Sequence, residues 1–269
     1  MTSRVAVKNK DPQNPQALMK KIDPRELVPM DLFFGGENAA LEIDLAYAKD
    51  DNLLFSETIY REDARLWLHI DLAKIVLLAS RFLARQGLTL VLYDGLRTIE
   101  AQARMANTKR SLANPQWTQG PERLLSPPGA GGHPRGMAVD VALKTAGGPL
   151  LDMGTPFDEL AQDSSAAKNP AHRDYQGHSP EIMKNRKILD LAMLTAADAL
   201  RTPLIGLPAE WWDFRQPAEI YNAHAPLSDA DLPAQMRMTD TRFESAPADL
   251  PPKHFNELKA ALEEEVAGL

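Results

Sequence analysis

The chain has 269 residues, of which 44% are hydrophobic and 25% are charged, as is ordinary for a soluble globular protein. It contains no cysteine, which excludes disulfides and thiolate metal ligands, so any metal ion has to be held by histidine and carboxylate side chains. The formal net charge is −7 and no basic stripe is visible, which argues against a nucleic-acid partner.

The sequence also argues against a membrane partner. Residues 1–8 contain no apolar run of the kind that a signal peptide needs. The most apolar stretch, residues 73–84, is interrupted by Arg81 and is too short to span a bilayer. We therefore expect a cytoplasmic protein.

The length predicts one main domain of about 180–200 residues with extensions. Residues 1–41 are punctuated by proline and are expected to form an irregular arm packed on the domain, which we place at 42–228. Residues 229–269 form an acidic extension with nine acids and four bases. Within it, residues 253–266 predict one amphipathic helix, packed on the body or on a second subunit, with a regulatory tail as the alternative.

The first half of the domain predicts helices around one strand. Residues 62–86 carry apolar side chains near helical spacing, and Gly87 is a plausible stop. Residues 88–93 are apolar and β-prone, so they predict a strand that delivers Asp94 and Arg97 to its end. A short helix at about 99–107 and a long loop at 108–132 should follow.

The second half adds further strands and a long helix. Residues 137–143 alternate in character, which predicts a strand with Asp140 between two alanines on one face. Ser179 and Pro180 mark the start of a helix that runs to about Leu200. Residues 204–207 and 209–214 are expected to be closing strands. Helices before and after a cluster of short strands predict an α+β domain.

Four polar residues suggest a metal site. His133 lies just before one predicted strand and Asp140 lies on it. Glu210 and Asp213 follow about seventy residues later. They supply one nitrogen ligand, two oxygen ligands and a spare carboxylate, which is the set that a hydrolytic metal site needs. Asp140 in particular is flanked by alanine and valine, and a buried carboxylate requires a cation or hydrogen-bond donors.

These residues belong to a series of short motifs in a fixed order. Residues 133–140 match the pattern His-x-Arg-Gly-x-Ala-x-Asp, and residues 153–158 match Met-Gly-x-x-Phe-Asp. The other matching segments are residues 43–52, 93–97, 185–186 and 210–212. With these motifs the chain resembles the D-alanyl-D-alanine dipeptidases, the VanX-like zinc DD-peptidases, over roughly residues 42–226.

The resemblance implies a DD-peptidase (Hedgehog-type) fold, in which a small antiparallel sheet flanked by helices carries the metal. It also implies one Zn²⁺ ion per chain, with His133, Asp140 and the residue at position 213 as ligands. This chain has Asp213 where the family has histidine. A His-Asp-Asp set neutralises a dication, whereas His-Asp-His leaves one positive charge, so Mn²⁺ or Fe²⁺ also come into consideration.

Three further roles follow from the resemblance. Glu210 corresponds to the general base that acts on metal-activated water, and Arg97 to the arginine that stabilises the oxyanion. Asp158 corresponds to the residue that receives the substrate's ammonium group. The alternatives are a surface glutamate, a helix-end arginine in a surface ion pair and a helix N-cap carboxylate, respectively.

The spacing of Glu210 and Asp213 constrains the backbone between them, and two substitutions in the motifs concern the substrate. In a regular strand, residues three apart face opposite sides, so Glu210 and Asp213 can share a site only through a bulge or bend. Gly131 replaces a family serine and Leu96 replaces a tyrosine, and both changes bear on substrate choice.

The function expected from the sequence is therefore that of a metal-dependent dipeptidase. Its partner would be D-Ala-D-Ala or a similar small dipeptide, as in peptidoglycan metabolism. Two alternatives stay open: a catalytically weak or silent binding protein of the same fold, and a related metallo-peptidase or amidase with another small substrate. A homo-oligomer is compatible with the C-terminal helix.

Overall fold

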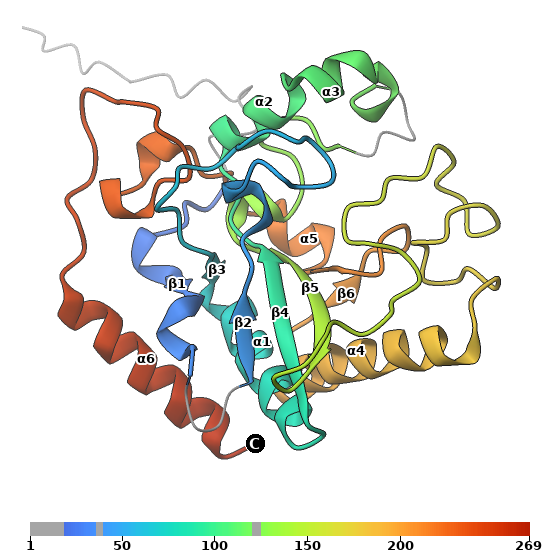
Figure 1. Ribbon diagram of the computed structural model, residues 1–269. Coiled ribbons are helices and arrows are strands. Elements are labelled where there is room, and N and C mark those ends of the chain that lie inside the picture. The colour runs from blue at the N-terminus through green and yellow to red at the C-terminus, as the bar shows by residue number, and fades with distance from the viewer. Residues whose placement is uncertain (1–18, 36–39, 120–124) are drawn as a thin grey trace, which may run out of the picture.

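A five-stranded sheet forms the centre of the protein, in the order β2-β4-β5-β7-β6 (Figure 1). The computed structural model describes residues 19–35, 40–119 and 125–269. The strands are β2 (Leu41–Ile43), β4 (Leu88–Asp94), β5 (Ala138–Thr145), β6 (Ile205–Gly206) and β7 (Asp213–Arg215). β2 pairs with β4 in parallel, and the other pairs are antiparallel. The predicted α+β class is confirmed, with a mixed sheet whose antiparallel part carries the candidate site.

Helices pack around this sheet. They are α1 (Ile70–Ala84), α2 (Ile99–Ala106), α3 (Lys109–Ala113), α4 (Pro180–Ala199), α5 (Ala218–Tyr221) and α6 (Pro252–Ala267). α1 packs against α4 and β4, and nine of its fifteen residues are buried. The Ser179 hydroxyl caps α4 by accepting a hydrogen bond from the Ile182 backbone N–H at 3.3 Å. Within the described segments, no helix combines the length and apolar character needed to cross a membrane.

A second, two-stranded sheet corrects the predicted start of the first long helix. β3 (Trp67–His69) pairs antiparallel with β1 (Leu27–Pro29), so α1 begins at Ile70 and not at residue 62. Leu27 and Val28 are fully buried, which makes the described part of the N-terminal arm a component of the core. Residues 1–18 and 36–39 of that arm lie outside the described residues, and the boundary at residue 41 stays a prediction.

The register of the sheet places three aspartates in one row. The pairing of β4 with β5 shifts between Leu92 and Asp94, so that Asp94 lies opposite Asp140. On the other side of β5, Asp140 lies opposite Asp213 of β7. Directly paired residues of neighbouring strands project from the same face of the sheet. The irregularity in β4 therefore brings Asp94 into line with the other two aspartates.

A turn replaces part of a predicted strand. Residues 209–212 are not extended: the Glu210 N–H donates to the Leu207 carbonyl at 3.3 Å, and the Asp213 N–H donates to the Glu210 carbonyl at 3.4 Å. Pro208 occupies the position of the first turn that favours proline. The chain thus bends between Glu210 and Asp213, as a shared site requires. The predicted loop at 108–132 also differs, because α3 lies within it.

The C-terminal extension packs on the body of the protein. Phe255, Leu262 and Val266 of α6 are buried, and the Phe255 ring lies 5.9 Å from the Trp67 ring of β3. Lys74 of α1 forms a 2.7 Å ion pair with Glu265. Figure 1 shows α6 along the outside of the molecule, next to β1. The predicted amphipathic helix is therefore present, with its apolar face covered by this chain.

We expect Phe255→Ala to lower the free energy of unfolding by about 3 kcal/mol, because it empties a buried aromatic site. Phe255 is 7% exposed, whereas Phe34 is 65% exposed and serves as the matched control. Phe34→Ala should change the stability by less than about 0.5 kcal/mol. Denaturant unfolding followed by circular dichroism measures both. Equal effects of the two substitutions would contradict the docking of α6 on the core.

Candidate metal centre and active site

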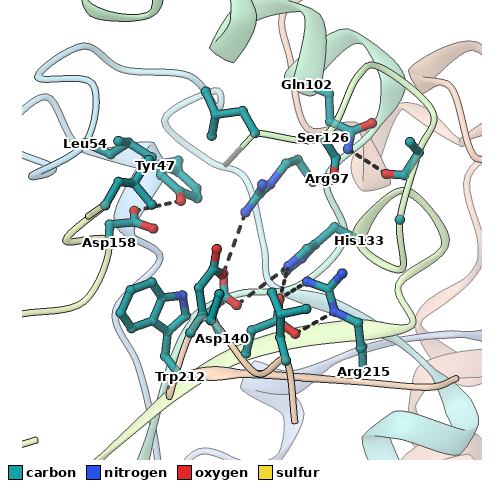
Figure 2. A pocket seen from close by; sticks show the side chains of 18 of the residues that line it. Tyr47, Leu54, Arg97, Gln102, Ser126, His133, Asp140, Asp158, Trp212 and Arg215 are labelled. Carbon is teal, nitrogen blue, oxygen red and sulfur yellow. Dashed lines mark hydrogen bonds and ion pairs between the residues drawn. The ribbon is translucent and has the colours of Figure 1, made fainter. Parts of the chain in front are cut away.

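One cavity of ≈ 360 Å³ brings together every residue that the sequence predicts for the site. Its lining includes Arg97, His133, Asp140, Asp158, Glu210 and Asp213. Figure 2 shows the labelled members of this set, Arg97, His133, Asp140 and Asp158, converging on one space. Two of the positions that differ from the family bear on substrate choice: Gly131 lines the cavity, whereas Leu96 is buried in the core.

The His133 ring is oriented by a backbone carbonyl. Its Nδ1 lies 2.8 Å from the Gly95 carbonyl oxygen, and since a carbonyl only accepts, Nδ1 carries the proton of that bond. Gly95 is needed there, because a Cβ would lie 2.6 Å from the Trp67 carbonyl oxygen. The other ring nitrogen, Nε2, is left facing the cavity. A metal-binding histidine usually donates the N–H of its other ring nitrogen to a carbonyl or carboxylate in this way.

Two carboxylate oxygens lie near the cavity-facing nitrogen of His133, at distances that suit ligands of one metal ion. His133 Nε2 lies 3.6 Å from Asp140 Oδ1 and 3.4 Å from Asp213 Oδ2. A tetrahedral ion about 2.0–2.2 Å from each ligand separates the ligand atoms by roughly 3.3–3.6 Å. Asp140 Oδ1 is buried and has no hydrogen-bond partner among the described residues. An unpaired buried oxygen of this kind fits a cation. The residues present therefore fit a divalent metal ion.

Asp94, which the sequence did not single out as a site residue, completes with His133 and Asp140 a group of possible ligand atoms in the described part of the chain, and Asp213 is not in that group. One potential ligand atom each from Asp94, His133 and Asp140 lie within 4.8 Å of one another. The oxygens of Asp94 are already occupied, however: Oδ1 accepts from the Tyr60 hydroxyl at 2.7 Å, and Oδ2 accepts from Arg97 Nε and Nη2 at 2.9 and 2.6 Å. Asp94 thus holds Arg97. Its Oδ2 lies 3.6 Å from His133 Nδ1, the nitrogen bonded to Gly95, whereas Asp213 Oδ2 lies 3.4 Å from Nε2, which faces the cavity. Although both oxygens of Asp213 also pair with Arg215, Asp213 is therefore the better-placed candidate for the third ligand position.

Arg97 lies in the cavity and not on the surface, with a side chain that is 12% exposed. Besides its bonds to Asp94, its Nη2 lies 3.6 Å from Asp140 Oδ2, and its guanidinium lies 5.1 Å from the centre of the Tyr47 ring. These contacts fix a positive charge beside the proposed ligands. A fixed donor in this position suits the stabilisation of an oxyanion.

Asp158 lies across the cavity, where the chain adopts a left-handed conformation with φ of 64°. It is no helix cap, because the next helix, α4, begins at Pro180. Its Oδ2 accepts a 2.7 Å hydrogen bond from the Tyr47 hydroxyl. Burial, and then the charge of Asp140, raise the pKa of Asp158 to about 7. A cation bound beside this carboxylate would favour its ionised form.

Glu210 reaches the cavity from the turn that precedes β7. Burial raises the pKa of its carboxyl group to about 8, together with the negative charges of Asp213 and Asp140. An acid with a pKa near the working pH both accepts and returns a proton readily, as a general base must.

Arg215 is a site residue that the sequence did not reveal. Its Nε donates to Asp213 Oδ1 at 2.7 Å and its Nη2 donates to Asp213 Oδ2, so the pair is bidentate. Burial would raise the pKa of Asp213, but the Arg215 charge holds it well below its usual range. The only signal in the sequence is the spacing, since residues two apart in a strand share a face.

His133 balances these carboxylates when no metal is bound. Burial and the Arg97 charge lower the pKa of His133, but the Asp140 and Asp213 carboxylates outweigh them and raise it to about 10. Near neutral pH, which is below this pKa, the imidazole is therefore protonated and cationic. A metal ion can bind Nε2 only after that proton leaves.

Zinc binding near neutral pH should accordingly release about one proton or more, and the affinity should rise as the pH rises toward 10. Isothermal titration calorimetry in buffers of different ionisation enthalpy measures the released protons. His133→Ala should abolish binding, whereas the control His172→Ala should leave the release unchanged. Binding of zinc to the wild-type protein with no dependence on the buffer would contradict this assignment of His133.

Comparison with known proteins agrees with the motifs. The sequence profile of the D-ala-D-ala dipeptidase family, peptidase family M15, matches residues 26–229, so the chain belongs to this family of peptidases. The D-alanyl-D-alanine dipeptidase of Escherichia coli (strain K12) is 31% identical over 195 residues, which are 72% of this chain and 86% of that protein. The predicted family is therefore confirmed, and the match begins earlier than residue 42.

A solved structure, the L-Ala D-Glu endopeptidase of Serratia marcescens, is 16% identical and aligns with a TM-score of 0.33. The alignment covers 71% of this chain and 98% of that protein.

Proposed function

We propose that this protein is a metal-dependent dipeptidase that hydrolyses D-Ala-D-Ala or a similar small dipeptide. One observation carries the proposal: His133 Nε2 lies 3.4–3.6 Å from two carboxylate oxygens, in the same cavity as Glu210 and Asp158. The family, and the name of the relative in Escherichia coli, support a dipeptide as the substrate.

His133, Asp140 and Asp213 would hold one divalent ion. When bound, such an ion acts as a Lewis acid toward the scissile carbonyl and makes water a better nucleophile. Zinc suits this mixed nitrogen and oxygen donor set, and Mn²⁺ or Fe²⁺ is compatible with its two carboxylates.

The other side chains would handle protons and charge. The Glu210 carboxylate takes a proton from the attacking water and gives it to the nitrogen of the leaving amino acid as the peptide C–N bond breaks. The Arg97 guanidinium, held by Asp94, donates to the carbonyl oxygen as negative charge develops there. Each group needs a fixed position, and burial among polar partners provides it.

Asp158 would select substrates with a free amino end. Its carboxylate accepts from Tyr47 and, among the described residues, forms no ion pair, so it can receive an ammonium group. The cavity of ≈ 360 Å³ lies near the lower end of the range for small-molecule sites, which favours short peptides. We also propose that the substrate comes from peptidoglycan metabolism; a cytoplasmic location and a homo-oligomer stay predictions.

A panel of dipeptides tests the proposal as a whole. Purified protein should hydrolyse D-Ala-D-Ala faster than L-Ala-L-Ala, lose this activity to a chelator and regain it with added zinc. Release of alanine, measured by chromatography, gives the rates. Binding of metal and dipeptide without hydrolysis would instead identify a silent binding protein, and cleavage of another small substrate alone would identify a different amidase or peptidase.

Glu210→Gln should keep the bound metal but lower kcat by about 10²–10⁴-fold, because the amide cannot accept the proton. Metal content by mass spectrometry and steady-state kinetics on D-Ala-D-Ala measure the two properties. Glu219→Gln, at an exposed position outside the cavity, is the matched control and should change neither. An unchanged kcat in the Glu210 variant would remove this residue from the mechanism.

Asp158→Asn should raise KM for a dipeptide with a free amino end far more than it lowers kcat, because the ammonium group loses its counter-charge. Without metal the pKa of Asp158 is about 7, and a bound dication lowers it, so in the active enzyme the carboxylate becomes protonated at or below pH 7. The wild-type kcat/KM should therefore fall on the acid side, as the pH drops below about 7, and the variant should lack this component. Asp174→Asn is the exposed control. Identical pH profiles for wild type and the Asp158 variant would refute the role.

A further inference from the structure

The three aspartates of the row differ in what neutralises them. Asp94, Asp140 and Asp213 are 0%, 3% and 1% exposed, so none is screened by bulk water. Asp94 is satisfied by Tyr60 and Arg97. Asp140 keeps one oxygen that has no hydrogen-bond partner in the described part of the chain, as a metal ligand would. Asp213 is neutralised by the guanidinium of Arg215, which lies within the candidate site.

Arg215 occupies a position from which it acts on Asp213 and on the ion together. It lies two residues beyond Asp213 on β7, lines the same cavity, and has a side chain that is 14% exposed. Its Nε and Nη2 take both oxygens of Asp213, while Asp213 Oδ2 also lies 3.4 Å from His133 Nε2 (Figure 2). A buried arginine this close to a bound dication repels it, so the Arg215 charge lowers the affinity that His133, Asp140 and Asp213 would have alone.

We propose that Arg215 is a positioning residue that makes Asp213 behave as a neutral metal ligand. His133 contributes no charge when it binds a metal, and Asp140 and Asp213 contribute one negative charge each, so a dication held by these three alone has no net charge. With the positive charge of Arg215 included, the site keeps one. This remaining charge is what polarises a bound carbonyl or water. The inference rests on the proposed metal site but not on the proposed substrate.

The charge balance predicts opposite effects of two substitutions on zinc affinity. Arg215→Gln removes a repelling charge and should tighten zinc binding about tenfold or more. Asp213→His keeps a metal-binding side chain but leaves the Arg215 charge unopposed, and should weaken binding about tenfold or more. The double variant should return toward the wild-type affinity. Competition with a chromophoric zinc chelator measures all four proteins without reference to catalysis.

Two control variants separate charge from structural support. Arg215→Lys keeps the positive charge but loses the bidentate geometry, and its zinc affinity should stay within about threefold of wild type. Arg65→Gln removes an equally bidentate partner, that of Asp31, outside the cavity, and should have no effect. Circular dichroism of each metal-free protein checks that it is folded.

Three outcomes would overturn the proposal: weaker zinc binding by the Arg215→Gln variant, an unchanged affinity in that variant, and a wild-type protein that binds no zinc. Weaker binding in both single variants would mean that Arg215 only supports Asp213 mechanically. If the opposite effects are found but no dipeptide is cleaved, the charge balance is supported and the proposed function fails by itself.

Discussion

The row of three buried aspartates across β4, β5 and β7 is the constraint on which the rest of the site depends. Like charges on neighbouring strands repel each other, and burial makes each of them more costly. Asp94 and Asp213 are each paired with an arginine. Asp140 has its Oδ2 3.6 Å from Arg97, and its Oδ1 is left for His133 or for a metal ion. The cationic side chains around the row thus stabilise the fold, because they neutralise the buried aspartates, and they also shape the chemistry of the site.

The same concentration of charge brings several groups into the titration range where proton transfer is useful. The pKa of Asp158 rises to about 7 and that of Glu210 to about 8, in both cases mainly through burial and then through the neighbouring carboxylates. His133 shifts upward because the carboxylates around it outweigh its burial. A metal ion bound among them would reverse part of each shift, since a dication favours the ionised carboxylates and the neutral imidazole. Metal binding and proton binding are therefore coupled throughout the cavity.

Backbone irregularities give the site its geometry. The shift in β4 sets Asp94 opposite Asp140, and the turn before β7 lets Glu210 and Asp213 face one cavity. The arm and the C-terminal helix contribute at a distance: β1 pairs with β3, whose Trp67 carbonyl approaches Gly95, and α6 covers Trp67 from outside. The carbonyl that orients His133 is thus held by segments from both ends of the chain.

The sequence by itself determined the class of fold, the family and the polar residues of the cavity that stand in motifs, because motifs and strand alternation are local patterns that one chain displays directly. It also predicted the long helix that begins after Ser179 and the amphipathic C-terminal helix. What only the tertiary structure decided is how these side chains are paired. Arg215 has no motif around it, and its role becomes visible only when Asp213 and Asp140 are brought opposite each other. The sequence did not predict the strand at 67–69, because its apolar pattern also fits a helix. Its partner β1 lies about forty residues earlier, and hydrogen bonding between distant segments leaves no local periodicity.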